Sequence, residues 1–171
     1  LSSVEKEHVE EFSTLRMAGH NIVEAIKGIK HLHKNLKIHV VSDNPHIRQE
    51  YNNIRLQIAR VLRELEVLQS DADEAVTILS LDQLKMEIGE RDIISTGVLD
   101  SLIRENRISA QMATSLMNDS AYCQDICRNL IHFGEALFAA SDPDEKEAER
   151  SVALDEIEIK EVLDKYKDGE N

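Results

Sequence analysis

Between Ile47 and Leu68 the sequence places an apolar side chain at every third or fourth position, and no other feature constrains the fold as strongly. The series is Ile47, Tyr51, Ile54, Ile58, Val61, Leu65 and Leu68. This spacing lines up one face of an α-helix, whereas a half-buried strand would alternate at every second residue. The segment therefore predicts a long amphipathic helix that packs against other helices.

Two further segments carry the same alternation. The first predicts a helix from about Val4 to Lys37, with the stripe Phe12, Leu15, Gly19, Ile22, Ile26, Ile29, His33 and Leu36. The last predicts a helix from Ser109 to about Ala140, with the stripe Met112, Leu116, Asp119, Cys123, Ile126, Leu130, Phe133 and Leu137. Asn44 and Ser109 suit N-cap positions, because their side-chain oxygens can accept hydrogen bonds from free backbone N–H groups.

The residues between these helices carry a weaker pattern. Ser70–Asp73 either caps a third helix or lies inside a continuation of the second helix. Gly89 and Gly97 interrupt the apolar spacing further on, and residues 105–107 are predicted to form a short loop.

These patterns predict an all-α fold, an antiparallel up-and-down bundle of long helices. The whole chain of 171 residues holds only 6 glycines and 2 prolines, which favours few, long elements over the many turns of an all-β fold. We expect the bundle to occupy residues 1–141. Residues 142–171 are acidic and are expected to form a separate amphipathic helix or tail.

Charge and cysteine use narrow the class of protein. The net charge of −13 opposes binding to the phosphate backbone of nucleic acids. No stretch has the roughly 20 apolar residues that a membrane-spanning helix needs. Cys123 and Cys127 lie four residues apart on one predicted helix, which is a poor geometry for a disulfide and fits a reducing compartment. We therefore expect a cytoplasmic segment that is itself soluble.

Asp119 is the strongest candidate for a functional residue, because it interrupts an otherwise apolar stripe. A carboxylate there is costly unless it is hydrogen-bonded, paired or bound to a cation. Asn118 and Ser120 add oxygen atoms beside it, so a divalent cation is one interpretation. The other is a polar contact between helices, with His20 or Asn21 as the facing group.

The sequence shows no recognisable enzyme active site. Cys123 and Cys127 lack the further ligands that a zinc site requires. Glu5 and His8 form a single Glu-x-x-His, whereas di-iron bundles use two copies. There is no glycine-rich phosphate loop and no nucleophile elbow. We predict that the chain is not an enzyme, and a metal-dependent enzyme of unknown class is the least supported alternative.

Several segments together resemble a known family. Residues 108–120 (ISAQMATSLMNDS) and 126–130 (ICRNL) resemble the PhoU-like cytosolic domain at the C-terminus of bacterial sodium/phosphate cotransporter-family proteins. Residues 21–32 (NIVEAIKGIKHL) are similar to the long first helix of these domains, and residues 51–55 (YNNIR) to the second. The resemblance spans roughly residues 21–140.

The resemblance implies a function in regulation. PhoU-like proteins are helical bundles that regulate phosphate transport or signalling, and some hold metal clusters through an acidic residue followed four positions later by Asp. The predicted main helices contain no such pair, so the metal motif is not carried over to this chain. We expect a regulatory domain at the cytoplasmic face of the inner membrane.

The expected partner is a transmembrane transporter part of the same chain or a separate permease. A stand-alone PhoU-like regulator or adaptor of phosphate uptake is the alternative. The long apolar stripes are also compatible with a homodimer.

Overall fold

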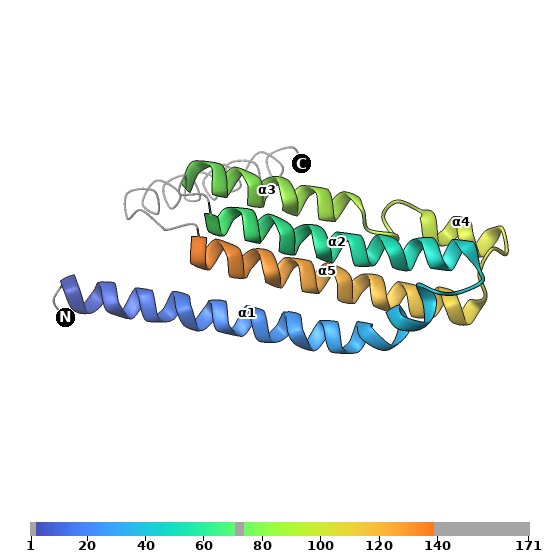
Figure 1. Ribbon diagram of the computed structural model, residues 1–171, viewed down its shortest axis with the longest axis horizontal. Coiled ribbons are helices and arrows are strands. Elements are labelled where there is room, and N and C mark those ends of the chain that lie inside the picture. The colour runs from blue at the N-terminus through green and yellow to red at the C-terminus, as the bar shows by residue number, and fades with distance from the viewer. Residues whose placement is uncertain (1–2, 71–73, 139–171) are drawn as a thin grey trace, which may run out of the picture. The chain divides into compact units, whose positions relative to one another are not determined.

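The computed structural model describes residues 3–70 and 74–138, and within these ranges it contains helices and no strand. The helices are α1 (Ser3–His39), α2 (Pro45–Ser70), α3 (Glu74–Glu90), α4 (Val98–Arg104) and α5 (Ala110–Phe138). The long helices run alternately up and down along a common direction, with the short α4 at one end (Figure 1). The structure therefore confirms the predicted all-α bundle.

Both predicted N-caps are present. The Asn44 side-chain oxygen accepts hydrogen bonds from the backbone N–H groups of His46, at 3.0 Å, and Ile47, at 3.2 Å. The Ser109 hydroxyl oxygen accepts one from the N–H of Met112, at 3.2 Å. These bonds satisfy donors that the first turn of a helix leaves free, so they fix where α2 and α5 begin.

The weaker central pattern corresponds to two helices and a loop. α3 ends at Glu90, and residues 91–97 lead to α4. Gly97 precedes α4 with a φ of 73°. This is a left-handed backbone conformation that residues other than glycine rarely adopt. The predicted choice between a cap and a continuation at Ser70–Asp73 falls largely on residues 71–73, outside the described residues. The predicted acidic segment 142–171 also lies outside them.

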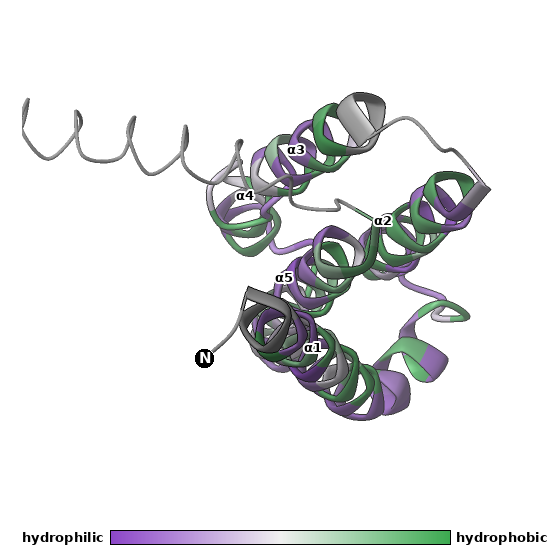
Figure 2. Cartoon of the chain, turned by 90° about the vertical axis from the view of Figure 1, so that its left-hand side faces the viewer, coloured by the Kyte–Doolittle hydropathy of each residue, from purple (hydrophilic) through white to green (hydrophobic). Residues whose placement is uncertain are grey.

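α5 is the central helix of the bundle. It packs against α1 on one side and against α2 and α3 on the other (Figure 2). Its buried positions are consequently spread around much of its circumference: Ala113, Leu116, Asp119, Ser120, Cys123, Ile126, Cys127, Leu130, Ile131 and Gly134. The predicted α2 stripe is confirmed as part of the same core, with only Ile58 partly exposed. Because α5 touches three long helices, one apolar stripe could not describe its burial.

The predicted core face of α1 is wrong. Phe12 is 70% exposed and Ile26 is 59% exposed, although both belong to the predicted stripe. The buried positions lie one residue earlier along the helix and include Ala18, Asn21, Ala25 and Leu32. Small side chains at this face let the backbone of α1 lie close to α5. At Gly28, an added Cβ would stand only 2.6 Å from Cγ1 of Ile126.

None of the described helices contains an apolar stretch long enough to cross a bilayer.

Candidate functional site

Asp119 lies at the centre of a polar cluster that joins three helices. Its carboxylate is only 2% exposed, on the face of α5 that meets α1 and α2. The Tyr51 hydroxyl on α2 donates a hydrogen bond of 2.5 Å to Oδ2 of Asp119. The Asn35 amide on α1 donates a second bond, of 2.9 Å, to the same oxygen. One buried carboxylate therefore holds a group from each neighbouring helix.

Tyr51 and His39 complete the cluster. The Tyr51 side chain is fully buried, and burial together with the negative charge of Asp119 raises the pKa of its hydroxyl far above the ordinary value. It therefore acts as a hydrogen-bond donor rather than an anion. The His39 ring lies 4.5 Å from the Tyr51 ring, measured between centroids. Its Nδ1 atom is buried without a hydrogen-bond partner, which is unusual for a polar atom and costs stability.

His39 gives the cluster a dependence on pH. Burial lowers the pKa of the ring, and the negative charge of Asp119 opposes that shift only in part. The unfolded chain therefore takes up a proton at higher pH than the folded chain, so stability is complete above the unfolded pKa of about 6.5 and is lost as the pH falls through that value. We expect urea titrations to show a loss below about 1 kcal/mol between pH 7.5 and 5.5, because the ring is only partly buried.

A matched pair of variants tests this prediction. In His39→Gln the position cannot take up a proton, so the loss of stability between the two pH values should shrink. His132→Gln, on α5 with an exposed side chain, should retain the wild-type loss. An unchanged pH dependence in His39→Gln would contradict the assignment.

The structure separates the predicted site residues. Asp119, Ser120 and Asn21 are buried, but Asn118 and His20 are exposed. The hydrogen bonds of Asp119 go to Tyr51 and Asn35, not to His20 or Asn21. The difference has a geometric reason: α1 and α5 run in opposite directions, and the middle of α5 lies beside the C-terminal half of α1 (Figure 1).

Sequence reasoning missed Tyr51, Asn35 and His39 as members of this cluster. Tyr51 was identified only as a member of the α2 stripe. Asn35 continues the series of buried and half-buried positions on α1 at the same alternating spacing, after Gly28 and Leu32, and this regularity was the available signal.

The geometry of the cluster favours a structural contact over a cation site. Both observed hydrogen bonds to Asp119 come from neutral donors. In the described part of the chain, no three His, Cys, Asp or Glu side chains gather where they could hold a metal ion. The Cys123 thiol is buried, and its contact with Cys127 together with burial strongly raises its pKa. A thiol held in this form is a poor nucleophile and a poor metal ligand.

A polar cleft of about 280 Å³ lies between α2, α5 and the segment that follows α3. Its walls include Glu50, Asn53, Gln57, Arg91 and Ser120. Burial raises the pKa of Glu50, and a hydrogen bond from Asn53 opposes this change. The cleft has room for a small polar molecule.

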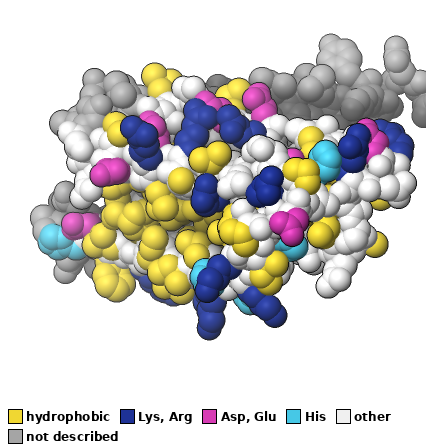
Figure 3. Space-filling view, turned by 45° about the vertical axis from the view of Figure 1, so that its right-hand side comes forward, with side chains coloured by type: hydrophobic (Ala, Val, Ile, Leu, Met, Phe, Trp, Pro, Cys, Tyr) yellow, Lys and Arg dark blue, Asp and Glu magenta, His cyan; other side chains and the backbone are white. Residues whose placement is uncertain are grey.

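A second groove, of about 260 Å³, lies between α1 and α2 and is almost entirely apolar. Its walls come from Ile29, Leu32, His33, Leu36, Arg55, Ile58, Ala59 and Leu62. α1 and α2 both pack on α5 but barely touch each other, so the groove stays open. Hydrophobic side chains gather in a continuous area on this side of the molecule, with Lys and Arg near its edges (Figure 3). A surface of this kind suits an apolar helix face.

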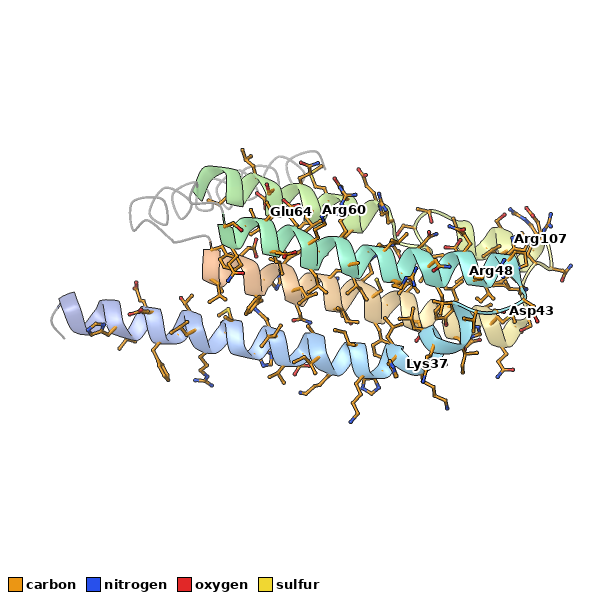
Figure 4. The ribbon with its side chains drawn as sticks, viewed as in Figure 1. Lys37, Asp43, Arg48, Arg60, Glu64 and Arg107 are labelled. Atoms are coloured by element: carbon orange, nitrogen blue, oxygen red, sulfur yellow. The ribbon has the colours of Figure 1, made fainter. Side chains whose placement is uncertain are left out.

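Charged side chains away from the groove form ion pairs between neighbouring helices. Arg60 on α2 forms an ion pair of 2.6 Å with Glu87 on α3. Lys85 on α3 pairs with Glu135 on α5. At the opposite end of the bundle, Lys37, Asp43, Arg48 and Arg107 lie near the connections between helices (Figure 4).

Comparison of the chain with profiles of known protein families, with characterised proteins and with solved structures found no significant match.

Proposed function

We propose that this chain is the cytosolic regulatory domain of a sodium/phosphate cotransporter-family membrane protein, and that it modulates phosphate transport through helix–helix contacts. The observation that carries the proposal is the open apolar face formed by α1 and the α1–α2 groove. Large aliphatic side chains are exposed there in helical register, although the described helices already bury a separate hydrophobic core. Such a face favours binding a partner helix over performing chemistry.

The resemblance to PhoU-like domains supplies the physiological setting. Its most extensive segment, residues 108–120, forms the start of α5 and includes the N-cap Ser109 and the buried Asp119. The resembling residues thus build the central helix and its contacts with α1 and α2. The exposed face supports a role in binding.

The proposed mechanism is a shift in conformational populations. A domain that binds one state of a transporter more tightly than another stabilises that state by the difference in binding free energy. Coupling of this kind typically changes an equilibrium by about 5- to 150-fold. The chain needs no catalytic group for such an effect, only helix–helix contacts whose strength differs between the states of the transporter.

Phosphate uptake by whole cells tests the proposal. Removing residues 1–171 from the chromosomal gene should change the initial rate of sodium-dependent uptake of radioactive phosphate by about fivefold or more. Restoring the wild-type sequence should restore the rate. Ile26→Asp, which places a charge on the apolar face, should fail to restore it. Met86→Asp, at a 68% exposed position on α3, is the matched control and should behave as wild type.

Both variants alter side chains that are exposed in the single chain, so each should keep the wild-type circular dichroism spectrum and melting temperature at concentrations where the wild-type chain is monomeric. Phosphate uptake that is unchanged when residues 1–171 are removed would overturn the proposed function.

A further inference from the structure

We propose that the helix that binds the open face is α1 of a second copy of this chain, running antiparallel, so that the domain acts as a symmetric dimer. The inference rests on the proposed function, because both take this face as a site of helix–helix contact. It adds which helix binds there. Three properties of α1 support it: the size of its apolar face, its uncovered N-terminal half and its distribution of charge.

The exposed apolar area is close to what a stable dimer needs. The large side chains on this face, each about half exposed, are Val9, Phe12, Leu15, Val23, Ile26, Ile29 and Leu62. At roughly 100 Å² each, they present on the order of 700 Å². A standard stable interface buries about 800 Å² on each partner. One helix of a second copy, lying along α1 and in the α1–α2 groove, could cover most of this area.

Among the described residues, none buries the stretch 8–17 in the N-terminal half of α1. It extends past the end of α5 (Figure 1), and none of the residues 8–17 is buried. Apolar side chains such as Phe12, Leu15 and Met17 therefore face water on a helix without tertiary support. Helices in water gain most of their stability from packing an apolar face. A partner helix would supply that packing.

The apolar stripe of α1 pairs with itself in an antiparallel register. If the symmetry axis passes near position 24, each stripe residue meets a stripe residue of the partner. Phe12 then lies opposite the partner's Leu36, and Ile22 opposite the partner's Ile26. Gly19, whose surroundings are open within 4 Å, lies opposite the partner's bulky Ile29. The spacing of three and four residues is the one that interlocking helices use.

The charge on α1 selects the antiparallel direction. Near its N-terminus the sequence has Glu5, Glu7, Glu10 and Glu11 against a single Lys6. In the stretch 27–37 it has Lys27, Lys30, Lys34 and Lys37 and no acidic residue. Parallel helices would place like charges side by side. In the antiparallel arrangement with the axis near position 24, Glu11 lies opposite the partner's Lys37, and Glu10 lies one position further along the same helix.

Measurement of mass in solution is the first test. Light scattering on the full chain after size exclusion should give twice the monomer mass of 19.4 kDa at concentrations near 100 µM. Ile26→Asp should weaken dimerisation by about 100-fold or more, while the Met86→Asp control should dimerise as wild type. A monomeric wild-type chain would overturn the inference and leave the face to the transporter itself.

Cross-linking tests the direction of the helices. Val23 and Val9 are both exposed and lie on the same side of the stripe, two heptads apart. In the antiparallel dimer two Val23→Cys residues meet near the axis, so a short bis-maleimide should link the copies. Two Val9→Cys residues would lie roughly 45 Å apart and should not be linked. The native Cys123 and Cys127 are buried and should not compete. Equal linking at both positions would overturn the antiparallel arrangement.

A charge exchange tests the register. Glu11→Lys alone and Lys37→Glu alone should each weaken the dimer about three- to tenfold, because each places like charges opposite one another. The double variant restores opposite charges and should recover most of the wild-type affinity. Additive losses in the double variant would overturn this register.

The results separate this inference from the proposed function. A monomeric chain that still controls phosphate uptake would refute the dimer and leave the function standing. A dimer whose loss in Ile26→Asp leaves phosphate uptake unchanged would refute the function and leave the dimer standing.

Discussion

Asp119→Ala should lower the free energy of unfolding by about 2–4 kcal/mol, measured by urea unfolding followed by circular dichroism. The substitution removes the acceptor for two donors at once, the Tyr51 hydroxyl and the Asn35 amide. Tyr51 is fully buried, so its hydroxyl would have no water to replace the lost bond. Leaving one buried donor without a partner typically costs about 1–3 kcal/mol. Removal of a buried charge returns only part of that loss.

Two further variants identify the cause. Asp119→Asn keeps the size of the side chain and one acceptor oxygen, so it should cost less than Asp119→Ala, about 1 kcal/mol. Asp125→Ala removes an exposed carboxylate from the same helix and should change stability by less than about 0.5 kcal/mol. If Asp119→Ala were as stable as wild type, the polar cluster would have no structural role.

Divalent cations separate the two interpretations of Asp119. We expect the melting temperature of the wild-type chain to be the same with magnesium, manganese or a chelator, because the hydrogen bonds already account for this carboxylate. A cation-dependent increase that Asp119→Ala abolishes would instead support a metal site.

The parts of the fold that depend on local sequence could be predicted. The N-caps Asn44 and Ser109 act through bonds within three residues of themselves, so the sequence alone contains both partners. The α2 stripe was also predictable, because α2 buries a single face and its large side chains mark it. The loop at residues 105–107 follows from the loss of periodicity between α4 and α5.

The core face of α1 could not be predicted in the same way. Two stripes run along this helix one residue apart, a large aliphatic one that includes Ile22 and Ile26 and a small one that includes Ala25 and Gly28. Hydrophobicity favours the aliphatic stripe as the core. In the structure the other stripe faces the core. Its small residues Ala25 and Gly28 allow the backbone of α1 to lie close to α5. If α1 pairs with a second copy, both stripes are interfaces, one within the chain and one between chains.

Of the four residues of the polar cluster, only Asp119 could be predicted from the sequence. Asp119 interrupts an apolar stripe, which is visible in the sequence. Its partners come from two other helices, and their identity depends on how far each helix is shifted along its neighbour. The apolar spacing repeats with each heptad, so it cannot distinguish one shift from the next. Asn35 and Tyr51 become its partners only in the observed register.

Gly28→Ala should destabilise the chain by about 1–3 kcal/mol, although the same substitution at Gly19 should stabilise it by about 0.5–1 kcal/mol. Both glycines lie inside α1, where alanine is the better helix former by roughly 1 kcal/mol. Around Gly19 the space is open, so only this gain applies. At Gly28 the added Cβ would collide with Cγ1 of Ile126, an atom next to the backbone of α5 on a stiff β-branched side chain.

Relief of that collision requires α1 to move away from α5, which would stretch the bond between Asn35 and Asp119. The comparison should be made at a concentration where the chain is monomeric, since Gly19 also lies on the proposed dimer face. The change in unfolding free energy caused by the higher helix propensity of alanine is the same in both variants. The difference between their unfolding free energies therefore measures the cost of disturbing the close α1–α5 packing. Equal stabilisation by both substitutions would mean that α1 does not approach α5 closely. The small residues of α1 would then not explain why this face, rather than the aliphatic one, is buried.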